Sequence, residues 1–92
     1  MAKRIYSSID FGRQFRIERK VLGRTQEWVA KTVGCQRKAI IDLEAGRNVE
    51  MRTVFAALSA LDKALMIVSS RPEAGEPWDF WDEPLEDQTP DP

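Results

Sequence analysis

The sequence predicts an all-α chain of four to five short helices, followed by a short strand and an acidic tail. All five prolines lie after residue 71, and four of the five glycines are spaced eleven or twelve residues apart. Between these glycines, apolar residues recur at helical spacing. Because proline interrupts helices, its absence from residues 1–71 leaves helices free to form there. We therefore expect one small folded domain over 1–71 and a flexible, disordered tail over 72–92.

The first predicted helix ends near Gly23, because glycine readily adopts the left-handed conformation that terminates helices. Phe11 and Phe15 are four residues apart, as are Ile17 and Val21, which is the spacing of one helical face.

The second predicted helix begins after Thr25, a good N-cap, and ends at Gly34. Glu27 lies in its first turn, where the helix dipole favours a negative charge.

Gly12 lies inside the first helix rather than at its end. We expect it to permit close packing of another helix.

The third predicted helix covers about residues 36–45 and ends at Gly46, with Ile40 and Leu43 facing inward. A fourth begins near Met51 and carries apolar residues at helical spacing, namely Val54, Phe55, Leu58 and Leu61.

Residues 64–68 form a short apolar run that contains β-branched residues and precedes two serines. This composition favours a strand, and a lone strand leaves its backbone groups without partners. The same segment of a second copy could pair with it about a two-fold axis. The predicted dimerisation residues are Leu65, Met66, Ile67 and Val68. The alternative is a last helical turn packed on the core.

The net charge of −1 conceals an uneven distribution. Residues 1–71 carry fourteen basic and seven acidic side chains, hence +7, whereas residues 72–92 carry eight acidic side chains and no basic one, hence −8. A basic domain suits a polyanionic partner, and the acidic tail suits a different role.

The same composition argues against several classes of protein. No segment approaches the roughly 20 apolar residues that span a bilayer, and no apolar run follows the basic N-terminus as in a secretory signal. A single cysteine, Cys35, makes no internal disulfide, so we expect a protein of the reducing cytoplasm. Histidine is absent, and neither a glycine-rich phosphate loop nor clustered metal ligands occur. We expect no enzyme, no metal and no cofactor.

Residues 25–46 read as two short helices joined by a turn at Gly34, which is a helix-turn-helix. The second helix of this motif can enter the major groove of DNA. It begins with Gln36-Arg37-Lys38, whose side chains can donate to guanine or pair with adenine.

This segment resembles the Xre and phage-Cro repressor family over about residues 9–62. The residues that match the family signature are Phe11-Gly12, Phe15-Arg16, Arg19, Gly23, Thr25-Gln26, Val29-Ala30, Gly34, Ile40, Glu44 and Gly46. The resemblance implies a lambda-repressor-like fold and binding to double-stranded DNA. This sequence departs from the family pattern at Arg24 and Glu18, where apolar residues are usual.

The resemblance also implies two sets of DNA contacts. The residues expected to face the bases are Gln36, Arg37, Lys38, Ile41 and Asp42. The residues expected to face phosphates are Gln26, Arg16, Thr25, Arg47 and Asn48. Asp42 repels phosphates unless it accepts from a cytosine amine.

The fourth helix, the strand and the tryptophan-containing tail are similar to the HipB-type antitoxins. That similarity implies a homodimeric transcriptional repressor of a toxin–antitoxin operon, bound to a palindromic operator and to a HipA-like kinase toxin. Two alternatives remain: a stand-alone Xre-family regulator, and a protein-interaction adaptor that acts through its tail.

Several side chains admit a purely structural interpretation. Arg16, Arg19 and Lys20 are either an ordinary solvated face or, with the other basic residues, part of a phosphate-binding surface. Glu44 is expected to be structural and held by a partner such as Arg16. Trp28 is expected to pack or lie on the surface.

Three aromatic residues lie close together in the acidic tail: Trp78, Phe80 and Trp81. Because tryptophan and phenylalanine often anchor interfaces, we expect a partner-docking motif. The alternative is a cover that folds back over the basic domain and competes with DNA.

Overall fold

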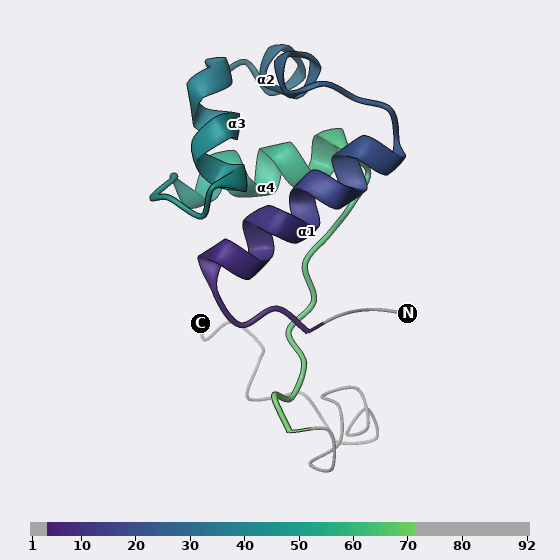
Figure 1. Ribbon diagram of the computed structural model, residues 1–92, viewed down its shortest axis with the longest axis vertical. Coiled ribbons are helices and arrows are strands. Elements are labelled where there is room, and N and C mark those ends of the chain that lie inside the picture. The colour runs from purple at the N-terminus through teal and green to yellow at the C-terminus, as the bar shows by residue number, and fades with distance from the viewer. Residues whose placement is uncertain (1–3, 72–92) are drawn as a thin grey trace, which may run out of the picture.

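The computed structural model describes residues 4–71 and confirms an all-helical domain. Its four helices are α1 (Ser8–Val21), α2 (Gln26–Val33), α3 (Arg37–Glu44) and α4 (Met51–Ala60). Figure 1 shows α2 and α3 joined by a tight turn on one side of the domain, with α1 and α4 crossing on the other. Consecutive helices are thus joined by short loops.

The helix boundaries follow the local chemistry that the sequence predicts. The Thr25 hydroxyl accepts a hydrogen bond from the backbone N–H of Trp28 at 2.9 Å and caps α2. Gly23, Gly34 and Gly46 all have positive φ, of 70°, 86° and 79°, so each break occupies a backbone conformation that favours glycine.

A small apolar core lies where the four helices meet. Its buried members are Phe15, Val29, Ala30, Ile40, Leu43, Ala57, Leu58 and Leu61. The predicted apolar pair Ile17 and Val21 lies outside this core, because these side chains are 52% and 75% exposed. The buried face of α1 is formed instead by Gly12, Phe15 and Arg19.

Gly12 marks the closest approach of α1 to α3. A Cβ atom at this position would lie 2.5 Å from the carbonyl oxygen of Glu44 and 2.6 Å from that of Leu43. Backbone atoms cannot move aside as a flexible side chain can. The expectation of close helix packing at Gly12 is confirmed.

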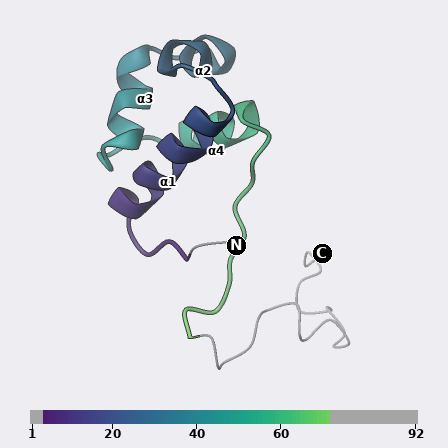
Figure 2. The same cartoon turned by 45° about the vertical axis from the view of Figure 1, so that its right-hand side comes forward.

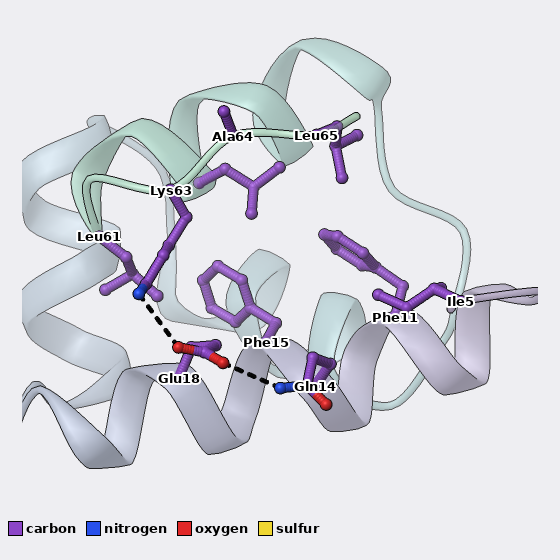
Figure 3. Close-up of a pocket in the computed structure, with 10 residues that line it drawn as sticks. Ile5, Phe11, Gln14, Phe15, Glu18, Leu61, Lys63, Ala64 and Leu65 are labelled. Atoms are coloured by element: carbon purple, nitrogen blue, oxygen red, sulfur yellow. Dashed lines mark hydrogen bonds and ion pairs between the residues drawn. The ribbon is translucent and has the colours of Figure 1, made fainter. Parts of the chain in front are cut away.

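Residues 63–69 leave the end of α4 as an extended arm without assigned helix or strand, so the alternative of a last helical turn is wrong. Figure 3 shows the start of the arm above α1, with Lys63 pointing toward Glu18, and Lys63 Nζ lies 3.1 Å from Glu18 Oε1. Further along, Arg4 Nε donates to the Ser69 carbonyl at 2.9 Å, which ties the N-terminal segment to the arm. The views in Figures 1 and 2 agree that the arm then leaves the helices.

The predicted strand is not present in this single chain: no strand is assigned anywhere in residues 4–71. A strand is defined by hydrogen bonds to a neighbour, and residues 64–70 make no backbone–backbone hydrogen bond within the described chain. The acidic tail, with the predicted docking residues Trp78, Phe80 and Trp81, lies outside the described residues. Among those described, no helix is long and apolar enough to cross a membrane.

Candidate nucleic-acid interface

The turn at Gly34 presents the first turn of α3 on the surface of the domain. Val29 and Ala30 of α2 pack against Ile40 of α3, and all three are buried. This seam fixes the angle between the two helices and leaves the opposite face of α3 in solvent. Its exposed leading residues are Gln36, Arg37 and Lys38.

Gln36 is the N-cap residue of α3, and its side chain makes no capping hydrogen bond. The side chain is exposed and points to no partner within the described chain. The first backbone N–H groups of a helix have no intrahelical acceptor. The start of α3 therefore offers both backbone and side-chain donors to an acceptor in solvent.

A network of polar side chains connects this surface to the core. Glu44 accepts two hydrogen bonds from the Arg19 guanidinium, at 2.6 and 3.1 Å, and a third from Gln26 Nε2 at 3.0 Å. The side-chain oxygen of Gln26, Oε1, in turn lies 3.3 Å from Arg37 Nη2. The network thus runs from Arg19 on α1 to the end of α3, then to the first turn of α2, and from there to the first turn of α3.

The Arg19–Glu44 ion pair corrects two sequence-based interpretations. Arg19 is 7% exposed, so it is neither a solvated side chain nor a phosphate ligand. The partner of Glu44 is Arg19 and not Arg16. A third guanidinium contact, from Arg19 Nη1 to the carbonyl of Arg24 at 2.8 Å, completes its hydrogen bonding. The spacing of Arg19 from Phe15, four residues on the buried face, was a signal of burial.

Asp42 brings two further candidate residues together. Its Oδ2 lies 2.9 Å from Lys38 Nζ, and its Oδ1 lies 3.0 Å from Arg47 Nη1. The hydrogen bond from Lys38, followed by that from Arg47, lowers the pKa of Asp42 below its usual range. Two expected base contacts and one expected phosphate contact therefore form a single ion-pair cluster.

The remaining candidates lie around these two groups. Thr25 accepts from the Trp28 N–H as the α2 cap, and its O–H remains available to donate to an acceptor such as a phosphate. Ile41 is 38% exposed on α3. Arg16 and Asn48 are exposed, and neither has a hydrogen-bond or ion-pair partner among residues 4–71.

Arg24, one of the two departures from the family pattern, lies over the Trp28 ring at 4.3 Å from the guanidinium carbon to the ring centroid. This cation–π contact, which sequence reasoning missed, leaves Trp28 half-buried against the core. The signal available in the sequence was the spacing: Arg24 precedes Trp28 by four residues, with the start of α2 between them.

No cluster of three or more potential metal ligands exists in the part of the chain that the structure describes. Cys35 is a free, half-buried thiol packed against the core beside the α2–α3 turn. The arrangement of side chains around α3 is suited to donating hydrogen bonds and positive charge to an external acceptor.

Solved structures share this architecture, whereas neither a family model nor a curated protein matches the sequence. The chain is similar to HipB in its complex with the O2 20-mer, with 24% identity, a TM-score of 0.73, and coverage of 77% of this chain and 100% of that chain. It is also similar to the HipB chain of a HipA–HipB–O2–O3 complex, with 24% identity, a TM-score of 0.72, and coverage of 76% and 100%. At this identity the likeness establishes the fold.

A third structure is more similar in sequence. The restriction-modification controller protein C.AhdI from Aeromonas hydrophila is 31% identical, with a TM-score of 0.58 and coverage of 62% of this chain and 88% of that chain. The four-helix order, the glycine turn between α2 and α3 and these likenesses agree. The chain belongs to the Xre-like helix-turn-helix family.

Proposed function

We propose that the protein is a sequence-specific, DNA-binding transcriptional repressor that inserts α3 into the major groove. The observation that carries this proposal is the exposed Gln36-Arg37-Lys38 turn at the start of α3, held by a buried α2–α3 seam. An α-helix fits the major groove, and these side chains match the donor and acceptor pattern of base edges. HipB, which shares the fold, is seen in DNA operator complexes.

In this proposal the two sets of candidate residues have different tasks. Base contacts come from Gln36, Arg37, Lys38, Ile41 and Asp42 on the exposed face of α3. Phosphate contacts come from Gln26, Arg16, Thr25, Arg47 and Asn48 around it. Phosphate contacts supply affinity without sequence preference, and base contacts supply the preference.

We propose a homodimer that pairs through residues 65–68. Leu65, Met66 and Ile67 are 46%, 69% and 88% exposed, which is unusual for consecutive large apolar side chains. The backbone of this arm also lacks hydrogen-bond partners in the described chain. An antiparallel pair about a two-fold axis satisfies both requirements and places two copies of α3 for half-sites on a palindromic operator.

The more specific proposal is an antitoxin that represses its own operon and binds a HipA-like kinase. It is supported by the likeness to HipB, which one structure contains together with HipA. Trp78, Phe80 and Trp81 in the tail are the proposed docking residues. The likeness to C.AhdI favours a second candidate, a regulator that works without a toxin partner.

The first experiment measures binding of the purified full chain to its own upstream DNA and to scrambled DNA of equal length, at two salt concentrations. We expect a preference for the upstream DNA, with affinity that falls steeply as salt rises. Equal binding to both DNAs, lost at moderate salt, would contradict the proposal.

Alanine variants then locate the interface. Arg37→Ala should cost about 1–3 kcal/mol on the upstream DNA and relax one base position. Arg13→Ala is the matched control, because Arg13 is another exposed arginine, on α1, with no assigned role. Equal losses for the two variants would mean that Arg37 reads no base.

Deletion of residues 72–92 separates the repressor from the adaptor. A repressor of this design retains its preference for upstream DNA without the tail, and an antitoxin additionally loses its HipA-like partner. Loss of DNA preference in the truncated chain would instead favour a role of the tail in DNA recognition.

A further inference from the structure

One acidic side chain stands among the proposed DNA contacts, and both of its oxygens are held by cations. Asp42 accepts from Lys38 through Oδ2 and from Arg47 through Oδ1. The carboxylate is 16% exposed, whereas the side chains of Lys38 and Arg47 are 78% and 65% exposed. The two cations therefore pair with the anion while remaining open to solvent themselves.

The backbone conformation around the end of α3 positions these two cations beside Asp42. The backbone N–H of Arg47 donates to the Asp42 carbonyl at 2.8 Å, which folds the chain after α3 back onto the helix. Gly46, with a φ of 79°, makes the required turn. Lys38 lies one helical turn before Asp42, at the spacing that favours such pairs. One cation thus reaches the carboxylate from within α3 and the other from the loop that follows it.

The same two cations are attractive to any phosphate. An exposed ion pair is weak, so a DNA backbone can compete with Asp42 for Lys38 and Arg47. The competition exposes an uncompensated carboxylate beside the phosphates, unless a base amine such as N4 of cytosine donates to it. The free-energy cost of the unpaired carboxylate is the same on every DNA, whereas the hydrogen bond from a base amine that offsets it depends on the DNA sequence.

We propose that Asp42 is a specificity-determining residue, which restrains sequence-independent DNA binding by holding Lys38 and Arg47 in ion pairs. The role rests on the proposed function, because it concerns the same face of α3. Its signature is a gain of indiscriminate binding when the carboxylate is neutralised, which distinguishes it from a residue that merely contacts a base.

The test compares Asp42→Asn with Asp62→Asn in the full chain. Both substitutions remove one negative charge and conserve shape. Asp62 lies on the turn after α4 with a φ of 60°, a conformation that asparagine tolerates. Binding to scrambled DNA is measured by fluorescence anisotropy across a salt series, and to upstream DNA in parallel. Thermal melting confirms that both variants fold.

For Asp42→Asn we expect binding to scrambled DNA to tighten by up to about fivefold, the strength of a good exposed ion pair. The salt dependence should steepen by about one phosphate contact per protomer. Binding to upstream DNA should gain less, so the ratio of the two affinities falls. The double variant Lys38→Met/Asp42→Asn should lose part of the gain, because it lacks one released cation.

Equal behaviour of Asp42→Asn and Asp62→Asn on scrambled DNA would overturn the proposal, as would weaker binding of a folded Asp42→Asn to both DNAs. The repressor proposal fails separately, if the wild-type chain binds both DNAs equally. The comparison on scrambled DNA still decides the role of Asp42 in that case, since it needs no operator.

Discussion

Neutralising Glu44 should destabilise the domain far more than neutralising an exposed glutamate. The Arg19 and Glu44 side chains are 8% and 5% exposed, so solvent screens their ion pair little. Glu44→Gln leaves the guanidinium buried with one amide oxygen in place of a carboxylate. Removing one partner of a buried ion pair costs about 3–5 kcal/mol. Because small domains are stable by only about 5–15 kcal/mol, much of the total is lost.

Urea unfolding followed by circular dichroism measures this loss. Glu50→Gln is the matched control, because Glu50 is exposed at the N-cap of α4 and makes no side-chain capping bond. The control should lose less than about 1 kcal/mol, the usual range for charge at a helix terminus. The double variant Arg19→Met/Glu44→Met should recover part of the stability, since apolar residues often replace a buried pair well. Equal losses for Glu44→Gln and Glu50→Gln would refute the reasoning.

Three further predictions concern other parts of the domain. Gly12→Ala should lower the free energy of unfolding, measured in urea. Overpacking against the α3 backbone costs about 1–3 kcal/mol, which outweighs a helix-propensity gain of about 1 kcal/mol. Unchanged stability would show that α1 can shift away from α3. Hydrogen bonds from Gln14 and then Lys63 lower the pKa of Glu18, so the stability they contribute is present at neutral pH and lost as pH falls through the lowered folded-state pKa. Carboxyl NMR titration should find that Lys63→Met raises this pKa. Ile67→Lys should shift the protein toward monomer in sedimentation, and an unaltered dimer would place the interface elsewhere.

Local chemistry made the helix boundaries predictable from the sequence. The Thr25 cap and the left-handed Gly34 each depend on a few neighbouring residues, and both are present as expected. The packing role of Gly12 was also predictable, because a glycine within a helical pattern requires a reason other than a helix end.

Side-chain burial on α1 depended on the other helices and was harder to predict. Ile17 and Val21 repeat at helical spacing, but the face that meets α3 carries Phe15 and Arg19 instead. Hydrophobic spacing alone favours the apolar pair. It cannot reveal that Glu44, distant in sequence, supplies a buried partner for an arginine.

The predicted strand at residues 64–68 pairs with the same segment of a second copy, so the structure of a single chain cannot contain that pairing. Leu65, Met66 and Ile67 lie in an arm without helical turns and are all exposed, at 46%, 69% and 88%. The backbone hydrogen bonds that define a strand need a second segment, and no segment within residues 4–71 supplies them. Composition can therefore predict the conformation of the arm while its pairing stays a question of oligomeric state.

The polar network makes the recognition surface dependent on the core. Glu44 accepts from the Gln26 amide nitrogen, which turns the Gln26 oxygen toward Arg37. Arg37 is in turn oriented by an acceptor whose position is set by the buried Arg19–Glu44 pair. At 3.3–3.4 Å the last link is loose enough for Arg37 to exchange Gln26 for another acceptor. If α3 binds DNA as proposed, exchanging its exposed residues alone would alter which bases are contacted, whereas losing Glu44 would disturb how any residue at position 37 is presented.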